Sequence, residues 1–212
     1  MKAVIISGGK EPSKDLFFKE LNDADLIIGA DKGCEVLYKY NITPDYILGD
    51  FDSANIDIIN SIEAKAGKKI KFKREKDYTD TELAYNLAVE KGASEIILLG
   101  ATGTRYDHSL SNIGLMLRGL KKSIKVKVID DNNYIFLTDK PISLKGNKGD
   151  IISFHAYCDE VKNFSIIGAK YNLSNYTLKL GDSGLTTSNE FIEEEINITF
   201  DSGIVMILYT KD

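Results

Sequence analysis

Five short apolar runs, each ended by Gly or Asp, constrain the fold of this chain more than any other feature. They occupy residues 3–6, 26–28, 46–48, 96–99 and 126–129. Runs of this length between turn-forming residues are typical of strands covered on both faces. Helical periods lie between them, at Gly33, Val36, Leu37 and Tyr40, at Leu83, Ala84, Leu87 and Ala88, and at Leu110, Ile113, Gly114 and Leu117. This alternation predicts an α/β domain with a mostly parallel sheet flanked by helices.

The pattern of apolar and turn-forming residues changes after about residue 131. Turn-forming clusters crowd the rest of the chain, at residues 131–133, 145–150, 181–184 and 201–203, with short apolar stretches between them. Such spacing is typical of a small antiparallel β-sandwich. We therefore expect an α/β domain at residues 1–135 and a smaller antiparallel β-sandwich domain at residues 136–212.

Composition narrows the class of protein. Of 212 residues, 43% are hydrophobic and 28% are charged, which suits a folded globular chain and excludes disorder. The net charge of −5 argues against a nucleic-acid surface, which is usually basic. We expect neither a signal peptide nor a membrane helix, because no run approaches the ~18 apolar residues that a span needs. Cys34 and Cys158 lack a metal-binding spacing and are interpreted as reduced thiols of a cytoplasmic protein.

Acidic residues follow several of the predicted strands. In open parallel sheets, ligands bind beyond the carboxyl ends of the strands, so these residues are expected to meet at one edge. Asp50 and Asp52 come directly after the third run. Extended backbone would point both carboxylates the same way, and a hard cation such as Mg²⁺ suits such an oxygen-only pair. The alternative is that Gly49-Asp50 and Asp52-Ser53 only form a turn or cap the next helix.

Asp77 and Asp80 precede the helical stripe that begins at Leu83. Asp77 or Thr79 is a candidate N-cap, and Asp80 suits the positive end of a helix dipole. A cap uses one side chain, which leaves one aspartate to face a metal or a phosphate.

Arg105 and Asp107 follow a Gly-rich turn and open the last predicted helix of the α/β domain. Backbone N–H groups at a helix N-terminus attract phosphate, and Arg adds a bidentate fork. The alternative is that Asp107 caps the helix and Arg105 is solvated.

Common nucleotide and acyl-transfer motifs are absent from the sequence: there is no P-loop, no G-x-G-x-x-G after the first strand and no G-x-S-x-G elbow. Two other functions fit parts of the pattern. Asp50-Phe51-Asp52 is similar to the D-x-D motif of haloacid-dehalogenase-type phosphatases, although there the motif follows the first strand. The second alternative function is that of a non-catalytic nucleotide-binding module.

Taken in order, several segments resemble the thiamine pyrophosphokinase family over nearly the whole chain. The segments are Ala30 to Gly33, Ile42 to Asp45, Gly49 to Ser53, Asp77 to Asp80, Gly100 to His108, Lys170 to Leu173 and Thr187 to Phe191. One departure is Gly103-Thr104, where the family usually has Gly-Gly, and it concerns the backbone path beside the nucleotide.

The resemblance implies a reaction and a set of roles. Enzymes of this family transfer a pyrophosphoryl group from ATP to the thiamine hydroxyl and release AMP. By resemblance, Mg²⁺ is held by Asp50, Asp52 and Asp80, the nucleotide is bound by Asp31, Asp77, Thr102, Arg105 and Asp107, and thiamine is bound by Tyr171, Ser188 and Asn189. The proton acceptor is Asp80 or Asp107. The family also implies a homodimer with thiamine between the α/β domain of one subunit and the β-domain of the other.

Overall fold

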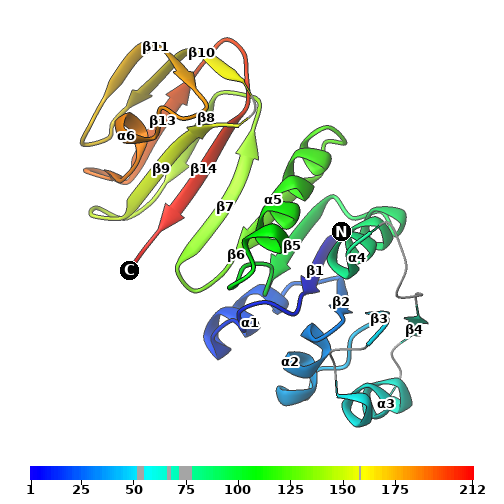
Figure 1. The fold of residues 1–212 in the computed structure, drawn as a ribbon. Helices are drawn as coiled ribbons and strands as arrows, with labels where there is room; N and C mark the ends of the chain where they lie inside the picture. Colours follow the sequence, from blue (N-terminus) through cyan, green and yellow to red (C-terminus); the bar gives the residue numbers. More distant parts are fainter. Residues whose placement is uncertain (52–54, 66–67, 72–77, 158) are drawn as a thin grey trace. The chain divides into compact units, whose positions relative to one another are not determined.

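The computed structural model describes residues 1–51, 55–65, 68–71, 78–157 and 159–212. The chain divides into two compact units, unit 1 at Met1–Asp131 and unit 2 at Asn132–Asp212 (Figure 1). The boundary that we expected after residue 135 would cut the first strand of unit 2, β7 (Asn133–Thr138). The division precedes that strand because its hydrogen-bonded partner, β14 (Val205–Thr210), lies in unit 2.

The described part of unit 1 contains a six-stranded parallel sheet in the order β6-β5-β1-β2-β3-β4. Its strands are β1 (Lys2–Ile6), β2 (Leu26–Ala30), β3 (Tyr46–Gly49), β4 (Lys68–Lys71), β5 (Glu95–Leu99) and β6 (Lys125–Ile129). The five apolar runs correspond to all of these except β4, so those strand predictions are confirmed. β4 was missed because its sequence, KKIK, has no apolar run.

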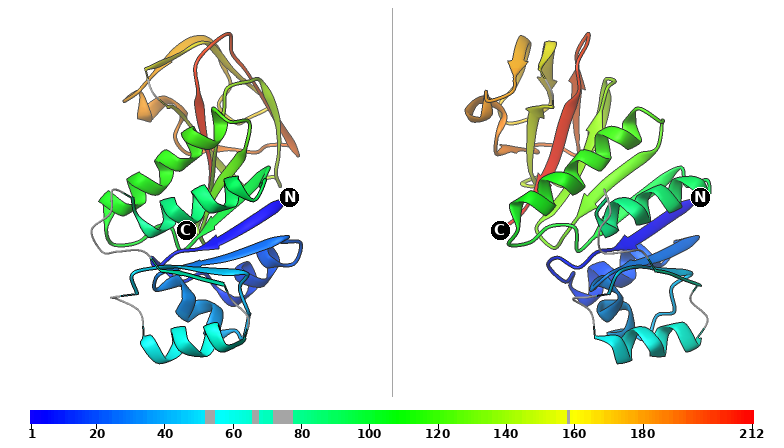
Figure 2. Two further views of the ribbon diagram at one scale, coloured as in Figure 1. Left: turned by 90° about the vertical axis from the view of Figure 1, so that its right-hand side faces the viewer. Right: turned by 45° about the vertical axis from the view of Figure 1, so that its right-hand side comes forward.

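Helices cover both faces of this sheet (Figure 2). They are α1 (Lys14–Leu21), α2 (Gly33–Lys39), α3 (Ile56–Lys65), α4 (Asp80–Glu90) and α5 (Tyr106–Leu120). α4 and α5 lie together on one face, whereas α1, α2 and α3 lie on the other. The parallel sheet flanked by helices is confirmed.

The stripe predicted for α5 is not the face that the helix buries. Leu110 is 67% exposed, and the buried residues of the helix are Asn112, Leu115, Met116 and Gly119. Gly119 decides the orientation, because a Cβ there would lie 2.3 Å from a methyl carbon of Val126 in β6. A helix can approach the sheet this closely only where a glycine faces it.

The direction in which successive strands are added to the sheet reverses between β1 and β5, which are themselves parallel. β1 pairs with β2 on one side and with β5 on the other, so the strands that follow β1 and β4 build outward in opposite directions. Such a switch point opens a crevice beyond the carboxyl ends of the two strands, which is where open α/β sheets bind ligands. Here the segments at that point are Ser7–Lys10 and Gly100–Thr104.

Unit 2 is an antiparallel β-structure with two sheets. One sheet has the order β12-β9-β14-β7, and the other has the order β11-β10-β13-β8. The remaining elements of the unit are β8 (Ile142–Lys145), β9 (Ile151–Ala156), β10 (Glu160–Ile167), β11 (Leu173–Lys179), α6 (Ser183–Thr186), β12 (Asn189–Glu190) and β13 (Glu195–Thr199). Residues from both sheets share one core, including Phe154, Ile207, Phe164 and Ile198. The expected antiparallel β-domain is confirmed.

Candidate active site

Asp31 and Asp50 leave the sheet side by side. β2 and β3 are parallel, with Ala30 opposite Leu48, and the Asp31 amide donates to the Leu48 carbonyl over 2.8 Å. Gly49 ends β3 with a positive φ of 150°, and a Cβ there would lie 3.2 Å from the Asp31 Cα. Glycine is needed here because the backbone conformation and the close approach both disfavour a side chain.

The backbone at Phe51 is not extended as we expected for the Asp50-Phe51-Asp52 motif. Phe51 has a φ of 57°, and its ring is buried against a cluster that includes Cys34, Ile47 and Ile59. Burial of the aromatic ring outweighs the strain of this left-handed backbone. The extended backbone on which we based this carboxylate pair is therefore wrong at Phe51. Asp52 lies outside the described residues, so its place beside Asp50 stays a prediction.

We call the sheet edge that carries Asp31 and Asp50 the acidic edge. A third candidate, Asp80, comes from a different element, α4. The N-cap of α4 is Thr79, whose hydroxyl accepts from the Glu82 amide over 3.2 Å, so Asp80 does not make the cap. Burial, followed by the negative charges of Asp31, Glu35 and Asp80, raises the pKa of the Cys34 thiol to about 12. Asp31 and Asp80 thus act on the same thiol, although Asp31 follows β2 and Asp80 begins α4. The other candidate in this segment, Asp77, lies outside the described residues.

A buried hydrogen bond fixes the start of α4. The Thr81 hydroxyl donates to the Ser7 hydroxyl over 2.9 Å, and both residues are buried. This bond ties the residue after Asp80 to the end of β1, at the switch point. Sequence analysis did not single out either side chain as part of the site, because they are 74 positions apart.

The two segments at the switch point form a hydrogen-bonded ribbon. Gly9 donates to the Gly100 carbonyl and Lys10 donates to the Thr102 carbonyl, each over 2.7 Å. A Cβ at Gly9 would lie 2.2 Å from the Thr102 oxygen, so only glycine allows this approach. Gly9 therefore serves close backbone packing.

Two side-chain hydrogen bonds hold the second segment of this ribbon, residues 100–104. The buried Asn112 of α5 donates to the Ala101 carbonyl over 2.7 Å. The Thr102 hydroxyl donates to a carboxylate oxygen of Asp130 over 2.8 Å. Thr102, predicted from resemblance to bind the nucleotide, thus donates its hydroxyl proton to Asp130, which follows β6. Asn112 is an anchor that the sequence pattern did not indicate.

Arg105 and Asp107 form an exposed ion pair at the N-terminus of α5. The guanidinium donates from Nη2 to Oδ2 over 2.6 Å and from Nε to Oδ1 over 3.2 Å. This contact raises the pKa of Arg105 and lowers the pKa of Asp107. The alternative in which Asp107 caps the helix is wrong, because Arg105 occupies the N-cap position and no side chain caps it.

Oxygen donors dominate the acidic edge. Within the part of the chain that the structure describes, no three His, Cys, Asp or Glu groups come together as a complete metal site. Asp31 and Asp50 nevertheless follow the carboxyl ends of the neighbouring strands β2 and β3, and carboxylate oxygens suit a hard divalent cation. The donor chemistry therefore fits Mg²⁺, with Asp52 and Asp77 outside the described ranges.

The candidate residues of unit 2 lie on a segment held against β9. Ser188 is exposed, has a φ of 57° and donates from its amide to the Ser153 hydroxyl over 3.0 Å. Asn189, in contrast, is 1% exposed, whereas Tyr171 is 59% exposed. Ser188 and Tyr171 are therefore accessible to a ligand, and the side chain of Asn189 is not.

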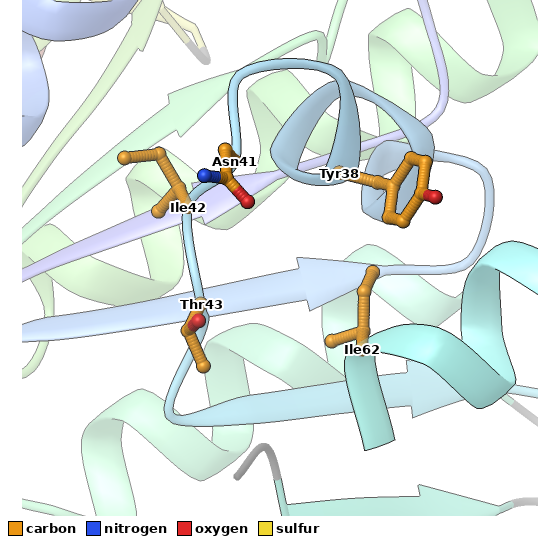
Figure 3. Close-up of a pocket in the computed structure, with 5 residues that line it drawn as sticks. All are labelled: Tyr38, Asn41, Ile42, Thr43 and Ile62. Atoms are coloured by element: carbon orange, nitrogen blue, oxygen red, sulfur yellow. The ribbon is translucent and has the colours of Figure 1, made fainter. Parts of the chain in front are cut away.

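Unit 1 also has a small surface pocket that is not part of the candidate active site. Figure 3 shows its lining, which consists of Tyr38, Asn41, Ile42, Thr43 and Ile62. Residues 41–43 precede β3, so this pocket is at the amino end of that strand. It is separate from the acidic edge, which follows the carboxyl ends of the strands.

Comparison with known families decides between the three functions considered for this chain. The family model described as the catalytic domain of thiamin pyrophosphokinase matches residues 17–128, and the model described as the vitamin B1 binding domain of thiamin pyrophosphokinase matches residues 139–205. The chain belongs to the thiamine pyrophosphokinase family. This membership leaves the phosphatase and the non-catalytic module without support.

Bacterial members of the family match this chain over its full length. Thiamine pyrophosphokinase of Bacillus subtilis (strain 168) is 34% identical, with complete coverage of both chains. The crystal structure of the B. subtilis enzyme superposes with a TM-score of 0.89 at 32% identity, again over all of both chains. The enzyme from Geobacillus thermodenitrificans gives a TM-score of 0.86 at 30% identity, over all of this chain and 98% of the other. The described helices include none long and apolar enough to cross a membrane.

Proposed function

We propose that this member of the thiamine pyrophosphokinase family transfers a pyrophosphoryl group from ATP to the primary hydroxyl of thiamine, giving thiamine diphosphate and AMP. The observation that carries the proposal is that one chain matches both the catalytic and the vitamin B1 binding models, in order and over most of its length. The acidic edge of unit 1 supplies the chemistry that such a transfer needs.

Phosphoryl transfer depends mainly on positioning and on neutralising negative charge. Asp50, Asp52 and Asp80 would hold Mg²⁺, with Asp31 and Asp77 nearby. When bound, the metal would offset charge that develops on the phosphate oxygens. The N-terminus of α5 offers uncapped N–H groups beside Arg105, and both attract phosphate.

Proton transfer from the thiamine hydroxyl needs an acceptor. Of the two candidates, Asp107 accepts hydrogen bonds from the Arg105 guanidinium, which lowers the pKa of Asp107 and makes it a weaker base. We therefore favour Asp80 as the acceptor, on a carboxylate oxygen that would not bind the metal.

Unit 2 would bind the organic substrate. Thiamine is cationic and aromatic, so the exposed ring of Tyr171 suits it through stacking and cation–π attraction. Ser188 adds an exposed hydroxyl beside a fixed backbone. The proposal includes a homodimer with thiamine between unit 1 of one subunit and unit 2 of the other, and a cytoplasmic enzyme.

The central experiment mixes the purified protein with ATP, MgCl₂ and thiamine and quantifies the products by chromatography. We expect AMP and thiamine diphosphate in equal amounts, with no AMP when thiamine is omitted and none after chelation of the metal. Formation of ADP and thiamine monophosphate would refute pyrophosphoryl transfer.

Subunit complementation tests the shared site. Asp50→Asn disables unit 1 and Tyr171→Ala disables unit 2, so each homodimer is defective at low thiamine. A mixed dimer contains one intact pairing if the site is shared between subunits, and mixing should then restore activity. No restoration in dimers shown to have exchanged subunits would place both halves of the site in one chain.

A further inference from the structure

The side chain of Asn189 is committed to the backbone of Tyr171. Its Oδ1 accepts from the Tyr171 amide over 3.0 Å, and its Nδ2 donates to the Tyr171 carbonyl over 2.8 Å. Oδ1 also accepts from the amide of Glu190 over 2.9 Å. With only 1% of Asn189 exposed, this side chain grips both polar backbone groups of Tyr171 and offers no surface to a ligand.

The segment that carries Asn189 is itself fixed. β12 pairs antiparallel with β9, where Asn189 lies opposite Ile152. The buried hydroxyl of Thr186, three residues earlier, donates to the Phe154 carbonyl. Asn189 therefore connects the turn that contains Tyr171 to β9, because its backbone pairs with β9 and its side chain bonds to Tyr171.

Further contacts hold the same turn. The Lys170 amide donates to the Glu190 carbonyl over 3.0 Å, and the Lys170 ammonium pairs with a Glu190 carboxylate oxygen at 2.7 Å. The Tyr171 ring is nevertheless 59% exposed, with the Lys170 nitrogen 5.7 Å from its centroid. The result is an exposed aromatic ring on a backbone that is held by hydrogen bonds on both its N–H and C=O groups.

We propose that Asn189 is a positioning residue that orders the ring of Tyr171 for thiamine, and that it does not touch thiamine itself. This inference rests on the proposed function and replaces the direct contact that family resemblance implies. Ordering a ring before binding removes part of the entropy that binding would otherwise lose, so the benefit of Asn189 is expressed in the affinity for thiamine.

A double-mutant cycle separates positioning from contact. Asn189→Ala in the wild-type background should raise the KM for thiamine about fivefold, the order expected when a cation–π contact is lost. In the Tyr171→Ala background the same change should raise it less than about twofold, because the ring it orders is gone. The KM for ATP and the kcat at saturating thiamine should stay unchanged in both backgrounds.

A fluorescence measurement reads the ordering without turnover. The chain has no tryptophan, so Tyr171→Trp creates a single reporter. Adding Asn189→Ala should lower the anisotropy of that reporter, whereas Asn197→Ala, a half-buried asparagine of β13 in the same unit, should leave both the anisotropy and the thiamine KM unchanged. If Asn189→Ala does not fold, Asn189→Asp serves instead, since it keeps the acceptor but loses the donor to the Tyr171 carbonyl.

The outcomes are distinct. The positioning role would be overturned if the effects of Asn189→Ala and Tyr171→Ala on the thiamine KM simply multiplied in the double variant. It would also be overturned if Asn189→Ala left the anisotropy of the tryptophan reporter unchanged. Either result would leave the proposed function intact. A wild-type protein that makes no thiamine diphosphate would instead overturn the proposed function, and the anisotropy measurement would still decide whether Asn189 orders residue 171.

Discussion

Replacing Gly9 by alanine tests the ribbon at the switch point. The added Cβ would lie 2.2 Å from the Thr102 oxygen and 2.4 Å from the Gly100 oxygen, well inside van der Waals contact. Both obstacles are backbone atoms, so no side-chain rotation can relieve them. The ribbon must separate, and two hydrogen bonds of 2.7 Å, one from Gly9 and one from Lys10, are strained or lost.

The expected cost follows from these contacts. Overpacking in a tight site costs about 1–3 kcal/mol, and a backbone hydrogen bond contributes about 1 kcal/mol. With the equivalent of one of the two hydrogen bonds lost, we expect Gly9→Ala to lower the free energy of unfolding by about 2–4 kcal/mol. With a urea m-value of about 2 kcal/mol/M, the midpoint falls by about 1–2 M. The KM for ATP should also rise, because the ribbon borders the crevice between β1 and β5.

Urea unfolding followed by far-ultraviolet circular dichroism measures the effect. Gly114→Ala is the matched control, because a Cβ there meets nothing within 4 Å and the residue lies inside α5. Alanine in a helix is favoured over glycine by about 0.5–1 kcal/mol, so this variant should be slightly more stable than the wild type. An unchanged midpoint for Gly9→Ala would refute the argument that close backbone packing requires glycine at this position.

Four further predictions follow from single residues. Asp50→Asn should lower kcat by more than ~100-fold in the AMP-release assay without changing the circular dichroism spectrum, because charge neutralisation carries the chemistry; wild-type turnover would remove this residue from the site. Ser188→Ala should mainly raise the KM for thiamine, and an effect on ATP alone would contradict the assignment of unit 2 to thiamine. Glu190→Gln leaves the Lys170 ammonium without its 2.7 Å partner beside the exposed tyrosine ring, so it should raise the thiamine KM about twofold, and Lys170→Met should not. Burial lowers the pKa of His155, so the unfolded chain takes up the proton first and stability should fall below about pH 6.5, a trend in urea midpoints that His155→Gln should remove.

Local pattern predicted much of the fold. Short apolar runs ended by Gly or Asp identified β1, β2, β3, β5 and β6, because strands covered on both faces need continuous apolar sequence. Where that signal was absent, in β4, the prediction failed. The stripe chosen for α5 was also wrong, since Leu110 is exposed and the close approach of Gly119 to β6 sets the face.

The candidate site was predictable in its residue types and much less in their roles. Aspartates at the carboxyl ends of strands could be found from sequence, because the sheet topology brings those ends together. The roles of Thr102 and Asn189 could not, since both are decided by partners distant in the chain. Asn189 belongs to a segment that resembles the family, yet its side-chain amide makes hydrogen bonds to the backbone of Tyr171, 18 positions away.

The sequence by itself determined the apolar strands of the parallel sheet, the family, and the acidic character of one sheet edge, because each depends on residue types and spacings along the chain. Only the tertiary structure decided that Phe51 turns inward, that Ser7 holds Thr81, and that Asn189 holds Tyr171. These choices arise from burial and hydrogen bonding between segments that the fold brings together, and no local periodicity encodes such partners.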